Sequence, residues 1–354
     1  MTSKAGSLDF RPFRAWRYSP KVRLDQVIAP PYDVISQAEQ ETLYAKSPFN
    51  VIRLILGREP DFHERASLAW QDWMAKGVLA QDSRSAFYLY EQRFEHPGTG
   101  HLKTRLALAG LLKLERSGAV VPHEQTFSAP KKDRFLLLEK TRTNLSPIFG
   151  LYHDSSGTLS RLFAVYQQKP PLFDAVDEKK TIHQGWAIEN DKDQKAIHEA
   201  LAPEKILIAD GHHRYETAME YQRRMREKFP AQNGEAPYDF VMMALVDFED
   251  PGLVMLPTHR VLRSFGAASQ PEFLKRLRAY FEFSPCPAEH LFSKLEKTSP
   301  KEMFFGVLFG KDENFLMRLK SLKEIEPFLP AHKPALWYGL DTNLLTHFIF
   351  KKLW

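Results

Sequence analysis

Residues 206–218 constrain the fold of this chain most strongly, because an apolar run ends there at an acid followed by a glycine. The run spans residues 206–209, and an amphipathic stretch over residues 215–229 predicts a helix behind it. A strand, a tight turn and a helix start bring backbone N–H groups and basic side chains to one point. We therefore expect the groups around residues 210–214 to form an open receptacle for a phosphate or another anion.

The turn offers several groups with distinct chemistry. Gly211 allows a tight turn and close approach of a ligand to the backbone. Asp210 is predicted to act as a general base or as a Mg²⁺ ligand, and Glu216 is a second candidate Mg²⁺ ligand. The residues expected to bind phosphoryl oxygens are His212, His213 and Arg214, the last through its planar fork of donors. The structural alternative is a capped helix, in which Asp210 is the cap and Arg214 pairs with an acid.

A stiff loop nearer the N-terminus presents another acid. Pro30 and Pro31 fix two φ angles and favour extended backbone in front of Tyr32 and Asp33. Asp33 is a candidate catalytic base and Tyr32 a candidate ligand-binding residue. A packed turn in which Asp33 caps the next helix explains the same residues. The surrounding segment, residues 8–35, is rich in aromatic rings and prolines, so it is expected to dock onto the body of the protein.

The apolar run at residues 51–56 reads as a strand. Arg53 lies inside this run, where a guanidinium group needs an anion or a route to solvent. Asn50 directly precedes the run. Asn50 and Arg53 are therefore candidate phosphate- or substrate-binding residues, and an edge strand with the Arg53 guanidinium in solvent is the alternative.

Three later segments add candidates. His123 and Glu124 are adjacent in a loop, and either could serve as a general base, although polar loops of this kind are more often inert. Residues 131–134 and 144–147 flank one predicted helix and could add phosphate contacts. His259 follows a strand and could line the same cleft or form a hydrogen bond in the core.

Charge, cysteine content and hydropathy indicate which partners and which compartment to expect for this protein. A net charge of +5 suits a small anionic ligand and gives no reason to expect nucleic acid as a partner. One cysteine in 354 residues cannot form an internal disulfide, which favours a reducing compartment. No apolar segment reaches membrane-spanning length, so a cytoplasmic protein without a membrane partner is expected. The oligomeric state is left open.

The absence of three well-known catalytic motifs argues against three classes of enzyme. The sequence has no Walker-type glycine loop, no His-Glu-x-x-His pair and no Gly-x-Ser-x-Gly turn. These absences count against P-loop NTPases, zinc proteases and α/β-hydrolases respectively.

Interleaved helical and strand-like patterns predict a mixed α/β (α+β) fold, with a mixed sheet, hairpins and flanking helices. Strands are predicted at residues 51–56, 87–94, 106–114, 206–209 and 240–246, with a further hairpin at 303–309 and 314–319. Helices are predicted at residues 37–45, 62–76, 131–140, 159–166, 191–201, 215–229, 272–281, 289–297 and from 341 onward. The length suits two α/β parts, residues 1–150 and residues 151–354, packed around one cleft.

Several segments in a fixed order resemble a known bacterial family. They are Phe10-Arg11-Pro12-Phe13, Ile28-Ala29-Pro30-Pro31-Tyr32-Asp33-Val34-Ile35, Ser47-Pro48-Phe49-Asn50-Val51-Ile52-Arg53-Leu54, Pro122-His123-Glu124, Asn144-Leu145-Ser146-Pro147 and residues 209–218. On these segments the chain is identified as a member of the family called "domain of unknown function 1015". Members of that family are expected to continue into a Met-Pro-x-Lys-Ser-Thr-like stretch beyond such a C-terminal helix, and the printed sequence does not include one.

The turn at residues 210–214 is also similar to the strand–turn–helix signature of the ParB/sulfiredoxin-like group, which includes nucleotide-handling proteins and free-serine kinases. This resemblance implies a ParB/serine-kinase-like core. It also implies that Asp210, His212 and Arg214 occupy a phosphoryl pocket, with Asp33 or Glu124 as the base that activates a serine hydroxyl.

The expected function is therefore a phosphotransferase that acts on a small hydroxyl-bearing metabolite, with free L-serine as the first choice. The expected cofactors are Mg²⁺ and a phosphate donor, either a nucleotide (ATP or ADP) or pyrophosphate. Two alternatives stay open: a phosphohydrolase or nuclease that uses the same pocket, and a non-catalytic nucleotide- or DNA-binding module.

Overall fold

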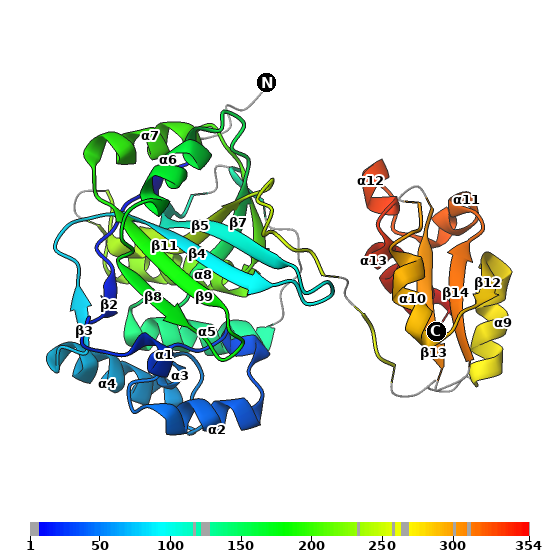
Figure 1. Cartoon of the computed structure of the whole chain (residues 1–354), viewed down its shortest axis with the longest axis horizontal. Coiled ribbons are helices and arrows are strands. Elements are labelled where there is room, and N and C mark those ends of the chain that lie inside the picture. Colours follow the sequence, from blue (N-terminus) through cyan, green and yellow to red (C-terminus); the bar gives the residue numbers. More distant parts are fainter. Residues whose placement is uncertain are drawn as a thin grey trace. The chain divides into compact units, whose positions relative to one another are not determined.

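The computed structural model describes residues 7–115, 118–121, 128–231, 234–256, 259–262, 269–299, 302–309 and 313–353 (Figure 1). The chain divides into two compact units, Met1–Val254 and Met255–Trp354. Each unit has its own sheet and its own apolar core.

The first unit is built on a mixed sheet. Its strands are β1 (Phe10–Arg11), β4 (Phe87–Glu95), β5 (Leu102–Lys113), β6 (Val120–Val121), β7 (Ile148–Tyr152), β8 (Phe173–Val176), β9 (Ile182–Ile188), β10 (Ile206–Asp210) and β11 (Phe240–Asp247). The order is β6-β10-β7-β11-β5-β4-β9-β8, and β1 pairs with β5. Two neighbouring pairs, β10 with β6 and β11 with β7, are parallel, while the other described pairs are antiparallel. The predicted hairpin of β4 and β5 is confirmed.

Three helices contribute to the core on one face of this sheet. They are α6 (Thr158–Gln167), α7 (Asp191–Leu201) and α8 (His212–Lys228). Phe163, Ile197 and Ala218 from these helices belong to the same buried cluster as Leu108 and Met243 from the central strands. Burial of each large apolar side chain contributes about 1.5–3 kcal/mol, so this layer fixes the start of α8 against the sheet.

A second layer comes from the N-terminal part of the chain and from the helix after β6. Its elements are β2 (Trp16–Tyr18), α1 (Leu24–Val27), η1 (Tyr32–Val34), α2 (Gln37–Lys46), α3 (Ile52–Ile55), α4 (Phe62–Ala75), β3 (Leu79–Gln81) and α5 (Ser128–Thr141). Helix α5 packs against both α4 and α8 (Figure 1). The aromatic arm packs onto the sheet, where Phe10 is buried and stacks on Phe87.

The predicted strand at residues 51–56 is wrong, because the chain forms the single helical turn α3 there. The Asn50 side chain starts this turn: its Oδ1 accepts a hydrogen bond from Ile52 N at 3.0 Å. The Leu56 N–H closes the turn on the Ile52 carbonyl at 2.9 Å. A short apolar run fits a buried helical turn and a buried strand equally well, so periodicity alone cannot distinguish them.

The second unit carries a small antiparallel sheet. Its strands are β12 (Phe281–Pro285), β13 (Phe304–Phe309) and β14 (Glu313–Leu319), in the order β12-β14-β13. The helical elements are α9 (Gln270–Tyr280), α10 (Ala288–Leu295), α11 (Leu322–Ile325), η3 (Glu326–Phe328), α12 (Ala335–Tyr338), α13 (Asp341–Leu344) and η4 (Leu345–Leu353); η2 (Pro237–Asp239) belongs to the first unit. The hairpin predicted at residues 303–309 and 314–319 is confirmed.

The predicted fold class, mixed α/β, is confirmed. The first compact unit ends at Val254, whereas the sequence suggested a division at residue 150, which lies inside β7. Strand β7 pairs with β10 and β11, both from residues beyond 150, and β11 pairs with β5 from before it. Within the described residues, no helix combines the length and the apolar character needed to span a bilayer.

Candidate functional site

Strand β10, a glycine turn and helix α8 follow one another as the sequence predicts. Gly211 lies at the N-cap position of α8 with φ of +94°, a left-handed conformation that residues with a Cβ rarely adopt. The pairing of β10 with β7 shifts register between Ile208 and Asp210, so the end of the strand is irregular. This turn directs Arg214 and the residues after it toward the loop between α5 and β7.

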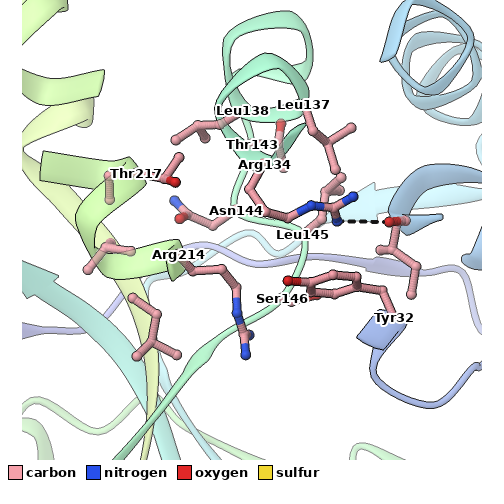
Figure 2. A pocket seen from close by; sticks show the side chains of 14 residues that line it. Tyr32, Arg134, Leu137, Leu138, Thr143, Asn144, Leu145, Ser146, Arg214 and Thr217 are labelled. Carbon is pink, nitrogen blue, oxygen red and sulfur yellow. Dashed lines mark hydrogen bonds between the residues drawn. The ribbon is translucent and has the colours of Figure 1, made fainter. Parts of the chain in front are cut away.

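A cavity of about 60 Å³ lies beside the first two turns of α8 (Figure 2). One water needs about 10–15 Å³ of such volume, so the space holds about four to six waters. Apolar side chains form much of its wall, among them Ile55, Leu137, Leu145, Ile148 and Val241. The polar lining groups are Tyr32, Arg134, Asn144, Ser146, Arg214 and Thr217. No carboxylate lines the cavity within the described residues, so the charge of its lining is positive.

Arg134 brings α5 into the site. Its side chain is 8% exposed, and its Nη1 donates to the Ile55 carbonyl at 2.8 Å (dashed in Figure 2). Its Nε and Nη2 donate to Asp133, and its guanidinium carbon lies 4.1 Å from the centre of the Tyr32 ring. These contacts fix the orientation of Arg134 and leave part of its five-donor set available to a ligand.

Arg214 brings α8 into the site. Its Nη2 donates to Asp210 and its Nη1 to the Pro147 carbonyl, which joins the start of the helix to the α5–β7 loop. An arginine has five N–H donors, and these two bonds leave others for a ligand. The Asp210 side chain is 55% exposed and that of Arg214 is 19% exposed, so water reaches the carboxylate and an anion could compete with it for the guanidinium.

Tyr32 lies between the two guanidinium groups. Figure 2 shows its hydroxyl pointing from η1 toward Arg214, with the ring beneath Arg134. Burial raises the pKa of the Tyr32 phenol, and the Arg134 charge opposes that shift. The phenol is therefore protonated at neutral pH and can donate a hydrogen bond. Asp33, its neighbour on η1, is exposed and is not among the lining residues.

Thr217 is the unusual residue of this cavity. It is 4% exposed, and its Oγ1 has no hydrogen-bond partner in the part of the chain that the structure describes. A buried hydroxyl without a partner costs about 1–3 kcal/mol, and native proteins contain few of them. Thr217 was missed as a site residue by sequence reasoning. Its spacing could have identified it, because residues three apart on a helix share a face and Thr217 follows Arg214 by three.

Asn50 and Arg53 lie away from this lining and have structural partners. Asn50 is fully buried, and its Nδ2 donates to the carbonyls of Gln26 at 3.0 Å and Ile28 at 3.2 Å. Arg53 donates to the Tyr44 carbonyl at 2.8 Å and lies over the Tyr44 ring. Both side chains therefore hold α1, α2 and α3 together.

The other candidates of the turn lie next to the cavity and do not line it. His212 is buried and His213 is half-buried in the first turn of α8. Glu216 forms an ion pair with Lys131 of α5. No group of three or more His, Cys, Asp or Glu side chains gathers as a metal site among the residues that the structure describes.

The remaining candidates belong elsewhere in the chain. His123 and Glu124 lie outside the described residues. His259 is exposed in the second unit, and its ring centre lies 5.4 Å from that of Phe292. The structure thus brings Tyr32, Gly211 and Arg214 together with Arg134 and the loop residues Asn144 and Ser146.

Gly211→Ala should lower the free energy of unfolding by about 1–2 kcal/mol, because a left-handed conformation costs that much for a residue with a Cβ. It should also weaken phosphate binding, since the added Cβ would lie 3.0 Å from Nη2 of Arg214. Gly77→Ala is the matched control: φ there is +66°, and no atom lies within 4 Å of an added Cβ. Thermal unfolding and calorimetric titration with phosphate measure both effects. Equal losses of phosphate affinity in the two variants would speak against a role for the Gly211 turn in binding.

Comparison with known proteins adds one finding. The search of curated proteins returns no match, and neither does the search of solved structures. A family model described as "Protein of unknown function (DUF1015)" matches residues 10–343. This range contains the residues that line the cavity and most of both compact units, so the chain belongs to the DUF1015 family.

Proposed function

We propose that this protein is a phosphotransferase that acts on a small hydroxyl-bearing metabolite, with L-serine as the leading acceptor. The observation that carries the proposal is the meeting of two guanidinium groups, Arg134 and Arg214, with the Tyr32 hydroxyl at one small cavity. Phosphoryl transfer depends mainly on positioning and on neutralisation of negative charge. Guanidinium groups suit this task because they stay charged and bind phosphoryl oxygens through two parallel hydrogen bonds.

In this proposal the acceptor occupies the cavity, and Arg214 neutralises the transferring phosphoryl group at the N-terminal turn of α8. The serine hydroxyl oxygen attacks phosphorus, and the bond from phosphorus to the donor's leaving oxygen breaks. The hydroxyl proton passes to a carboxylate. Asp33 supports this role because it is exposed next to Tyr32, and Glu124 is the other candidate base. The similarity of the 210–214 turn to that of ParB/sulfiredoxin-like serine kinases also supports the proposal.

The donor is proposed to bind outside the cavity, because a space for about four to six waters is too small for a nucleotide. ATP, ADP and pyrophosphate are the candidate donors. The exposed Asp210 carboxylate beside Arg214 is the candidate ligand for a Mg²⁺ ion carried by the donor.

The direct test is phosphorus NMR of the protein incubated with L-serine, Mg²⁺ and each of ATP, ADP and pyrophosphate. We expect O-phosphoserine with one donor, and we expect a large loss of this product in Arg134→Ala. Arg223→Ala is the control, since Arg223 is exposed on α8 and pairs only with Glu220 and Glu227 among the described residues. Phosphate release that does not require serine would indicate a phosphohydrolase instead. Nucleotide binding without turnover, in a folded protein, would indicate a binding module.

A further inference from the structure

Two polar side chains at the cavity have hydrogen-bonding capacity that no other described group of the protein uses. Among the described residues, the buried Thr217 hydroxyl has no hydrogen-bond partner and the Asn144 side-chain amide makes no hydrogen bond. Figure 2 shows the Thr217 oxygen pointing toward the Asn144 side chain, with both residues at the cavity. A hydroxyl and an amide together offer donors and acceptors but no charge.

Cationic side chains also line the cavity, and one of them lies close to Thr217 on the same helix. Arg214 precedes Thr217 by three residues and so lies on the same side of α8. In Figure 2 the Arg214 side chain extends below Thr217 from the same helix, Arg134 lies in the middle of the lining, and Tyr32 lies on the side away from Thr217. The apolar part of the lining includes Leu138, Leu145 and Ile148. The cavity therefore offers guanidinium groups and neutral hydrogen-bonding groups within an otherwise largely apolar lining.

We propose that Thr217 and Asn144 bind a polar group of a small hydroxy or amino acid in the cavity, with the carboxylate of that acid facing Arg134 and its reacting hydroxyl facing Arg214. The matching compounds are hydroxy or amino acids of a few heavy atoms, because the space holds about four to six waters. In this proposal the ligand supplies the hydrogen-bond partner that the Thr217 hydroxyl lacks within the described protein. This inference rests on the proposed function, since it makes the cavity the acceptor site, and it names Thr217 as the residue that selects the acceptor.

Thr217→Val tests the inference, because valine keeps the shape and removes the hydroxyl. Since that hydroxyl has no partner in the protein alone, the melting temperature without ligand should stay the same or rise. Affinity for L-serine, measured by calorimetry, should fall about tenfold, as expected for one lost hydrogen bond to a ligand. Thr217→Ser retains the hydroxyl and should restore most of the affinity.

Thr141→Val is the matched control. Thr141 is also buried on a helix, but its Oγ1 donates to the Leu137 carbonyl at 2.8 Å. This variant should therefore lose stability and keep its affinity for L-serine, the reverse of Thr217→Val.

Binding and turnover are measured separately, so the two proposals can fail separately. Binding of L-serine that depends on Thr217, without O-phosphoserine formation, would support this inference and reject the phosphotransferase. Destabilisation of the ligand-free protein by Thr217→Val would show that the hydroxyl has a structural role, and the inference would fall. It would also fall if L-serine bound equally well to wild type and Thr217→Val, or if neither L-serine nor O-phosphoserine bound to wild type.

Discussion

Arg214→Ala should weaken the binding of phosphate and pyrophosphate about 10- to 150-fold. A hydrogen bond to a charged group contributes about 1.5–3 kcal/mol, and a tenfold change in affinity corresponds to about 1.4 kcal/mol. The side chain is held at the cavity by Asp210 and by the Pro147 carbonyl, so a ligand meets a guanidinium that is already oriented. Calorimetric titration of wild type and variant with each anion measures the loss.

The fold should suffer much less from this substitution. The Asp210 carboxylate is 55% exposed and can be solvated when its partner is removed, so the lost ion pair costs at most about 1 kcal/mol. Arg214→Lys retains the charge without the planar fork and should give an intermediate affinity. Arg223→Ala, on the exposed side of the same helix, should bind both anions like wild type. A variant that melts far below wild type yet binds phosphate normally would show that Arg214 is a structural residue.

Local patterns in the sequence predict those elements whose signals lie within a few residues. The turn at Gly211 is one case, since an apolar run, a glycine and an amphipathic stretch follow one another directly. Helix α2 is another, because Ser36 and Glu39 form a capping box at its start, as their spacing favours. The β4–β5 hairpin is likewise marked by a Pro-Gly turn between two apolar stretches.

Other elements depend on contacts that are distant in the sequence. Strand β9 contains His183, Gln184 and Gly185, which do not form an apolar run, and no strand is predicted there. Gly185 accommodates the Phe173 ring, because a Cβ at this position would lie 2.2 Å from its nearest ring atom. Such a fit between β8 and β9 cannot be inferred from either segment alone.

The cavity was only partly predictable for the same reason. The basic turn at Arg214 was visible as a motif, and the segments that contain Arg134 and Asn144 were identified as candidate phosphate contacts. Their meeting with Tyr32 depends on the packing of α5 against α8 and on the docking of η1, both of which are tertiary. Thr217 was missed because a threonine in a predicted helix does not by itself indicate a binding residue. Only its burial and its missing hydrogen-bond partner, both seen in the structure, do so.

Asn50→Ala should destabilise the first unit by about 3–4 kcal/mol, the second large effect expected for this protein. The side chain is fully buried and makes three hydrogen bonds, two to the carbonyls of Gln26 and Ile28 and one from Ile52 N. Alanine would leave these backbone groups buried without partners, and each such group costs about 1–3 kcal/mol before the surrounding structure relaxes. Urea denaturation, followed by the fluorescence of Trp73 and its neighbours in the same cluster, measures the change.

Asn190→Ala provides the comparison, because Asn190 is exposed and caps α7 through the N–H groups of Lys192 and Asp193. Loss of an N-cap costs about 0.5–2 kcal/mol, so this variant should be clearly more stable than Asn50→Ala. At a temperature where Asn50→Ala is still folded, its affinity for phosphate should equal that of wild type, since Asn50 does not line the cavity. A variant of normal stability that binds phosphate poorly would instead place Asn50 in contact with the ligand, because a scaffold residue whose hydrogen bonds are all internal cannot lower affinity while the fold around it stays intact.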